Sequence, residues 1–109
     1  MIVSDWFDKG IALARLKMFY EAIACFDEVL KVNPRNADAL YNKGVALAGL
    51  GSYDEAIYYY DISLRINPNN PDALNNKGVA LAAQEKYEEA VEYFDKVLRM
   101  NPKNEIVFP

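Results

Sequence analysis

Residues 37–70 read ADALYNKGVALAGLGSYDEAIYYYDISLRINPNN, and the architecture follows from this segment because the chain repeats it. Residues 71–104 match it at 20 of 34 positions, and residues 3–36 keep its glycine, alanine, aspartate and proline. These residues recur every 34 positions, as Gly10, Gly44 and Gly78; Ala22, Ala56 and Ala90; Asp27, Asp61 and Asp95; and Pro34, Pro68 and Pro102. A fixed period of this length is typical of repeat architectures. The sequence therefore predicts a single array over residues 1–109, with residues 105–109 as a tail or the start of a truncated fourth repeat.

Each repeat has the apolar pattern of two helices. In residues 39–50 and 53–64, apolar side chains recur at steps of three and four, the spacing of one helix face. Gly51 lies between these segments and suits a left-handed helix end. Ser52 and Glu55 have the spacing of a capping box at the start of the second helix. The pattern predicts an all-α protein.

The remaining helix boundaries are indicated by asparagine and proline. Asn70 precedes Pro71 at the start of the third repeat, which is an N-cap residue followed by a proline at the first helical position. Proline restricts the residue before it and cannot continue a helix, so each second helix is expected to end at an Asn-Pro pair. These pairs are Asn33-Pro34, Asn67-Pro68 and Asn101-Pro102.

Small residues predict how the two helices of a repeat approach each other. The three glycines and three alanines of the period lie in the first and second helices, and the aromatic residues Phe26, Tyr60 and Phe94 are expected to fill the space beside the glycines. A glycine inside a helix destabilises it by roughly 1 kcal/mol relative to alanine. Its recurrence at equivalent sites therefore indicates a packing role, and three tolerated glycines are the alternative.

Composition excludes several classes of function. The net charge of −4, from 12 basic and 16 acidic side chains, argues against nucleic acid as the partner. The chain has no histidine and one cysteine, so neither His-assisted nucleophiles nor the usual zinc sites can be built. No apolar run is long enough to cross a bilayer, and no signal peptide is expected at the start. We expect a cytoplasmic protein that is not an enzyme and needs no cofactor or membrane.

The repeats resemble the tetratricopeptide repeat, whose signature combines a period of about 34 residues with W-x2-L-G-x2-Y, then A-x3-F, then P. The signature positions hold Trp6, Gly10, Ala22, Phe26 and Pro34; Leu40, Gly44, Ala56, Tyr60 and Pro68; and Leu74, Gly78, Ala90, Phe94 and Pro102. The departures are lysines at the leucine position (Lys9, Lys43, Lys77) and leucines at the first tyrosine (Leu13, Leu47, Leu81). The resemblance covers residues 3–104 and implies a right-handed superhelical α-solenoid of three helix-turn-helix repeats.

The resemblance also implies that the first helices line a concave groove that binds a protein or an extended peptide. The groove positions implied here are Ser4, Phe7, Asp8, Ile11, Ala14 and Arg15; Asp38, Tyr41, Asn42, Val45 and Ala48; and Asp72, Asn75, Asn76, Val79 and Ala82. These positions mix apolar and polar side chains, and three of their four charges are negative. An acidic ligand is therefore not expected.

Some proteins of this family clamp the acidic C-terminal tails of Hsp70 and Hsp90 chaperones with lysine, asparagine and arginine. Here only Asn42 matches those positions, and the others hold Phe7, Ile11, Asp72 and Asn76. We therefore do not expect a chaperone tail as the ligand. Asn42 and Asn76 occupy the same position one repeat apart and could hold the backbone of an extended peptide, since a side-chain amide both donates and accepts. The alternative is that both are solvated polar residues.

Charged and aromatic positions outside the groove have simpler interpretations. Asp27–Lys31, Asp61–Arg65 and Asp95–Arg99 have the spacing of i,i+4 ion pairs on the second helices. The run Tyr58–Tyr60 is interpreted as one core ring with at most two exposed rings, and an exposed recognition patch is the alternative.

The C-terminal end lacks the polar helix that usually caps such arrays. Residues 105–108, EIVF, restart the repeat pattern. Either the chain is a fragment of a longer array or the exposed end is covered by another copy. The second possibility predicts self-association through Val91, Phe94, Leu98 and residues 106–108, and it gives the alternative function, a module that joins like repeats end to end.

Overall fold

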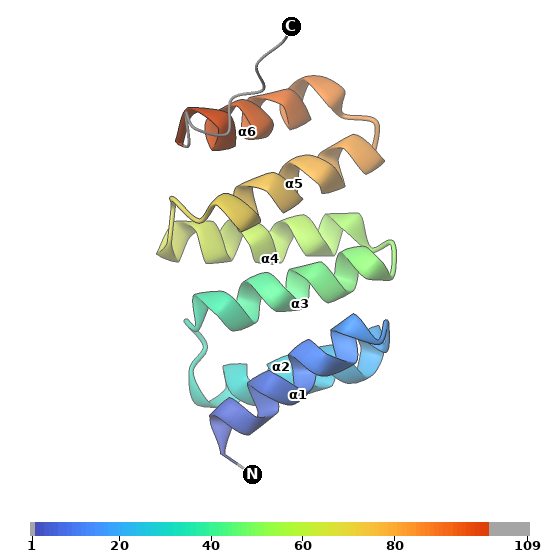
Figure 1. Ribbon diagram of the computed structural model, residues 1–109, viewed down its shortest axis with the longest axis vertical. Coiled ribbons are helices and arrows are strands. Elements are labelled where there is room, and N and C mark those ends of the chain that lie inside the picture. The colour runs from blue at the N-terminus through green and yellow to red at the C-terminus, as the bar shows by residue number, and fades with distance from the viewer. Residues whose placement is uncertain (1, 101–109) are drawn as a thin grey trace, which may run out of the picture.

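The computed structural model describes residues 2–100, which form six α-helices and no strand. In chain order these are α1 (Val3–Arg15), α2 (Phe19–Val32), α3 (Ala37–Gly49), α4 (Tyr53–Ile66), α5 (Pro71–Ala83) and α6 (Tyr87–Met100). They make three antiparallel pairs stacked along the long axis (Figure 1). The prediction of an all-α solenoid with two helices per repeat is confirmed. Among these helices, none is long and apolar enough to pass through a membrane.

The first helices of the repeats form one side of the stack. Each helix packs against the next one in the chain, and α3 also contacts both α1 and α5. Within residues 2–100, α4 has no such contact with α2 or α6. The first helices therefore lie closer together than the second helices. We call the side formed by α1, α3 and α5 the inner face.

Glycine on each first helix lets the aromatic ring of the paired helix approach closely. A Cβ on Gly10, Gly44 or Gly78 would lie 2.6 Å from a ring carbon of Phe26, Tyr60 or Phe94, respectively. Real Cβ atoms do not approach other atoms this closely, so no other residue fits without displacement. The packing role predicted for the glycines is confirmed in all three repeats.

The turn inside each repeat has the same hydrogen bonds. Gly51 has φ +79°, as a left-handed helix end requires, and its N–H donates to Ala48 O at 2.9 Å. The N–H of Ser52 donates to Leu47 O at 2.9 Å. The capping box predicted from Ser52 and Glu55 is therefore wrong: the Ser52 N–H is already bonded, and its side chain makes no cap hydrogen bond.

Asparagine side chains begin the first helices of the second and third repeats. The Asn36 side chain accepts from Ala39 N at 3.0 Å, and that of Asn70 accepts from Asp72 N at 3.0 Å, with Pro71 in the first turn. The second helices α2 and α4 end at the C-cap residues Asn33 and Asn67, each followed by proline. These boundaries agree with the sequence prediction. The pair at residues 101–102 lies outside the described residues, as do residues 105–109 of the expected tail.

Candidate functional site: the inner face and the joints between repeats

The sixteen groove positions lie on α1, α3 and α5, the helices of the inner face, and twelve of them, all except Ser4, Ala14, Ala48 and Ala82, are the predicted peptide-binding residues. They differ in how much of each side chain is accessible. The exposed ones are Asp8, Arg15, Asp38, Asp72, Asn75 and Val79, and the half-buried ones are Phe7, Ile11, Tyr41, Asn42, Val45 and Asn76. Polar groups therefore dominate the accessible part, and the apolar groups lie deeper.

The half-buried apolar residues rest on the core of their own repeat. The ring centroids of Phe7 and Phe26 are 5.9 Å apart, and the same distance separates Tyr41 from Tyr60. Val45 packs against the buried cluster that contains Tyr60. We call these side chains, Phe7, Tyr41 and Val45, the apolar floor of the inner face. Core contacts fix their positions, and part of each remains accessible to a ligand.

One hydrogen bond joins two repeats on the inner face. The Asn76 amide nitrogen donates to the Tyr41 hydroxyl oxygen at 2.6 Å, so α5 and α3 are linked. Burial raises the pKa of Tyr41, the nearby charge of Asp72 raises it further, and the bond from Asn76 opposes these effects in part. Tyr41 therefore stays protonated at neutral pH. The structure brings Tyr41, Asn76 and Asp72 together, a grouping that the sequence did not predict.

Asn42 is bonded within its own helix. Its amide nitrogen donates to the Asp38 carbonyl oxygen at 2.9 Å. The amide nitrogens of both Asn42 and Asn76 are thus occupied, whereas their Oδ1 atoms accept no hydrogen bond from residues 2–100. The two asparagines can offer acceptors to a peptide N–H directly, and their donors only by exchanging these bonds.

The accessible charge of the inner face is mainly negative. Three exposed carboxylates, Asp8, Asp38 and Asp72, accompany one exposed guanidinium, that of Arg15. Asp38 and Asp72 are equivalent positions in the first turns of α3 and α5. A ligand on this face therefore meets an excess of negative charge.

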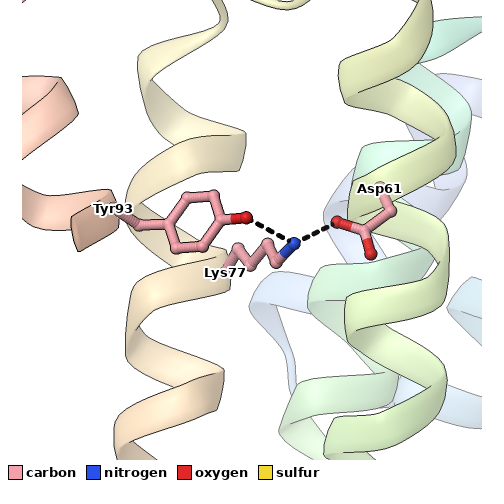
Figure 2. A network of polar contacts seen from close by, with 3 residues as sticks. All are labelled: Asp61, Lys77 and Tyr93. Atoms are coloured by element: carbon pink, nitrogen blue, oxygen red, sulfur yellow. Dashed lines mark hydrogen bonds and ion pairs between the residues drawn. The ribbon is translucent and has the colours of Figure 1, made fainter. Parts of the chain in front are cut away.

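Lysines that replace the motif's leucine connect successive repeats. Lys77 on α5 has its Nζ 2.6 Å from Asp61 Oδ1 on α4 and 2.8 Å from the Tyr93 hydroxyl on α6 (Figure 2). Lys43 lies 2.7 Å from Asp27 Oδ1, and its Nζ is 4.4 Å from the centroid of the Tyr59 ring. We call each set of aspartate, lysine and tyrosine a joint cluster.

The lysines of the joint clusters are nearly buried. Their side chains are 15% exposed for Lys43 and 14% for Lys77. Burial alone lowers the pKa of both, but the hydrogen bonds and charge of the aspartates, together with the tyrosines, outweigh it and raise the pKa of each lysine. Each ammonium thus stays charged and needs its aspartate as a partner.

The i,i+4 ion pairs predicted from the sequence are wrong, and two of their aspartates belong to the joint clusters instead. Within residues 2–100, Asp27, Asp61 and Asp95 do not pair with the basic residue four positions later, and Lys31 instead pairs with Glu28 at 2.9 Å. The physical reason is that a nearly buried lysine gains more from a carboxylate than an exposed basic group does. The spacing of 16 residues from aspartate to lysine was the signal for these pairs.

The three tyrosines of the run Tyr58–Tyr60 have different surroundings, and one of them belongs to a joint cluster. Tyr60 is buried in the core, Tyr59 lies under Lys43, and Tyr58 remains exposed. The run thus exposes one ring, that of Tyr58, which packs at right angles against Tyr59. The core position predicted for Tyr60 is confirmed.

The sequence matches the tetratricopeptide repeat family over residues 7–71 and again over residues 71–104. No curated protein matches the chain.

Three solved structures illustrate the similarity of the fold. The chain is 24% identical to the first TPR of Spaghetti (RPAP3) bound to the HSP90 peptide SRMEEVD, with a TM-score of 0.87 over 94% of this chain and 81% of that one. It is 24% identical to the TPR2B domain of yeast Sti1 in complex with pHsp70, with a TM-score of 0.86 over 94% and 82%. It is 26% identical to the MamA protein, with a TM-score of 0.82 over 98% and 60%. The chain thus spans about three fifths of that MamA structure.

Proposed function

Because this chain belongs to the tetratricopeptide repeat family, we propose that it is a protein-interaction scaffold that binds an extended peptide segment of a partner on its inner face. Two of its structural neighbours hold chaperone segments, an HSP90 peptide in one and pHsp70 in the other. The observation that carries the proposal for this chain is that Asn42 and Asn76, in adjacent repeats, each have an Oδ1 atom that accepts no hydrogen bond from residues 2–100 and lie near half-buried apolar side chains. The proposed role is binding without catalysis or a cofactor.

The chemistry of the inner face suits a peptide backbone. The free Oδ1 atoms of Asn42 and Asn76 can accept from backbone N–H groups of any sequence. The half-buried Val45 and the exposed Val79 can contact apolar side chains of the same segment. The backbone contacts would supply affinity and the apolar contacts selectivity.

The charge of the inner face sets which peptides are favoured. Asp38 and Asp72 are exposed in the first turns of successive first helices, so acidic segments are repelled and neutral or basic ones are favoured. The chaperone-tail clamp would need cationic side chains where this chain has Phe7, Asp72 and Asn76. We therefore propose a partner other than an acidic chaperone tail.

A random peptide library displayed on phage and selected on the full chain tests this proposal. The selected peptides are expected to be neutral or basic, and Asp72→Lys is expected to weaken the binding of the basic ones about tenfold in fluorescence anisotropy. Glu92→Lys is the matched control, because it makes the same change of charge at an exposed position of α6. Selection of acidic peptides, or equal loss in both variants, would contradict the proposal.

A second pair of variants tests the two asparagines apart from the Tyr41 hydroxyl. Tyr41→Phe removes the hydroxyl that accepts from Asn76, whereas Asn42→Ala with Asn76→Ala removes both proposed contacts to the ligand. Peptide binding is expected to survive the first change and to be lost with the second. If the double alanine variant binds as wild type, the asparagines are solvated polar residues.

A second candidate function is self-association through the C-terminal end of the stack. The observation in its favour is that Val91 and Leu98 on α6 are 54% and 45% exposed. Exposed apolar groups gathered on one end of a stack mark an interaction surface. Residues 106–108, which the sequence added to this surface, lie outside the described residues.

A further inference from the structure

Side chains at equivalent positions of the three repeats are buried to different extents. On α2 and α4 the rings of Phe26 and Tyr60 are completely or almost completely buried, whereas Phe94 on α6 is only half-buried. Tyr87 is 61% exposed, although its equivalents in the first two repeats are half-buried. The following repeat covers α2 and α4, and within residues 2–100 nothing covers α6 in this way. The surface of α6 at this end of the stack therefore resembles an interface between successive repeats, which we call an internal joint, from which the following repeat is missing.

At the other end of the stack, α1 lacks the cover that a preceding repeat gives to α3 and α5. Ala46 and Ala80 are 0% and 1% exposed because the preceding repeat packs on them, and the equivalent Ala12 is exposed. Lys9 is exposed, whereas Lys43 and Lys77 are nearly buried. The two ends of the stack thus carry opposite halves of the same joint.

The joint clusters show the same complementarity in charge. Asp95 is equivalent to Asp27 and Asp61, is exposed, and forms no ion pair with residues 2–100. The Lys9 ammonium has no carboxylate partner in the same range and lies 5.7 Å from the Trp6 ring centroid. Within residues 2–100, one end thus has an aspartate without an ion-pair partner, and the other end has a lysine without one.

We infer that the α6 end of one copy docks onto the α1 end of a second copy, with Asp95 of the first pairing with Lys9 of the second. This inference rests on the second candidate function and specifies its surface, its orientation and its ion pair. The contact is head-to-tail, so each joined pair keeps one free end of each kind. Association is expected to continue into longer chains as the concentration rises.

Several residues of the α1 end differ from their equivalents at the internal joints, among them Cys25, which stands where the joint clusters have Tyr59 and Tyr93, and Asp5. Asp5 occupies the position of Ala39 and Ala73, which are both fully buried at the internal joints. Docking would bring its carboxylate into a surface that elsewhere holds a methyl group, and burial of a carboxylate is unfavourable. The joint between copies should therefore be weaker than the joints within the chain, and Asp5→Ala should strengthen it.

Sedimentation velocity of the full chain over a range of concentrations tests the inference. Wild type is expected to associate, and Asp95→Lys and Lys9→Asp should each raise the dissociation constant about tenfold or more. An equimolar mixture of the two variants should associate again, because each joint then has one acidic and one basic partner. Glu92→Lys and Arg35→Asp make the same charge changes at exposed positions away from the clusters and should leave association unchanged.

The outcomes distinguish the inference from the broader candidate function. A wild-type chain that stays monomeric at millimolar concentration would overturn both. Association that persists in Asp95→Lys and Lys9→Asp would overturn the head-to-tail joint and leave self-association by another surface. Circular dichroism of each variant checks that these exposed substitutions leave the helices intact.

Discussion

Lys77 Nζ lies 2.6 Å from Asp61 Oδ1, across the boundary between the second and third repeats. Lys43 and Asp27 have the same relationship one repeat earlier, at 2.7 Å. An ion pair at a fixed position favours one register of the neighbouring helices over others, because a slipped register leaves a nearly buried charge unpaired. The repeats are therefore joined by apolar packing together with a polar contact that specifies how they align.

Asp61→Ala should destabilise the chain by about 1–3 kcal/mol, because it leaves the Lys77 ammonium without its carboxylate. Urea unfolding followed by circular dichroism measures the change in the free energy of unfolding. Asp95→Ala is the matched control, since this aspartate occupies the equivalent position and pairs with no residue of the range 2–100; its effect on a monomeric sample should be below about 0.5 kcal/mol. Equal effects of the two substitutions would show that the ion pair does not stabilise the joint.

Gly44→Ala should destabilise the chain by about 1–3 kcal/mol. The new Cβ would lie 2.6 Å from a Tyr60 ring carbon and 3.1 Å from the Ala56 carbonyl oxygen, so the helices of the repeat must separate. Tyr60→Leu in the same chain removes the ring and should make the penalty of Gly44→Ala smaller. If the effects of the two substitutions simply add in thermal unfolding, the two residues are not in contact.

Lys17→Gly and Glu85→Gly should each stabilise the chain by about 1 kcal/mol. Both residues have φ of 63° at turns where the second repeat has Gly51. A side chain at this backbone conformation is strained, and glycine removes the strain. The converse change, Gly51→Ala, should raise the free energy of the folded state by a similar amount. A lower melting temperature of Lys17→Gly would contradict this account of the turn.

Stability should be nearly constant from neutral pH to about pH 9.5 and should fall above about pH 10. The pKa values of Lys43 and Lys77 are raised above 10.5, and that of Tyr41 is raised above 10.0. A group whose pKa is raised on folding stabilises the fold fully below its unfolded pKa, and this contribution is lost as the pH rises through the folded pKa. Urea unfolding at several pH values measures this dependence. A free energy of unfolding that rises above pH 10 would contradict the assigned contacts.

Much of the fold follows from residue types that act locally. The period places the helix pairs, the asparagines begin α3 and α5, and Gly51 ends α3, since each depends on a few neighbouring residues. The glycine contacts could be predicted because the same small residue recurs opposite the same aromatic ring.

Contacts between repeats were harder to predict. The packing of Phe19 against Gly49, where a Cβ would be within 2.7 Å of the ring, depends on how α2 and α3 cross. Each aspartate of the joint clusters has a basic residue four positions away on its own helix, and only the burial of the lysine on the next repeat decides the pairing. The bond from Asn76 to Tyr41 likewise joins residues 35 positions apart. Sequence spacing alone does not give the distances across such joints.

Each repeat is held in place by its neighbours, and the middle repeat is covered on both sides. The sharpest test of this arrangement is amide hydrogen exchange of the monomeric chain, resolved by residue. We predict the slowest exchange in α3 and α4 and progressively faster exchange toward α1 and α6. Equal protection in all six helices, or the slowest exchange in α6, would contradict it.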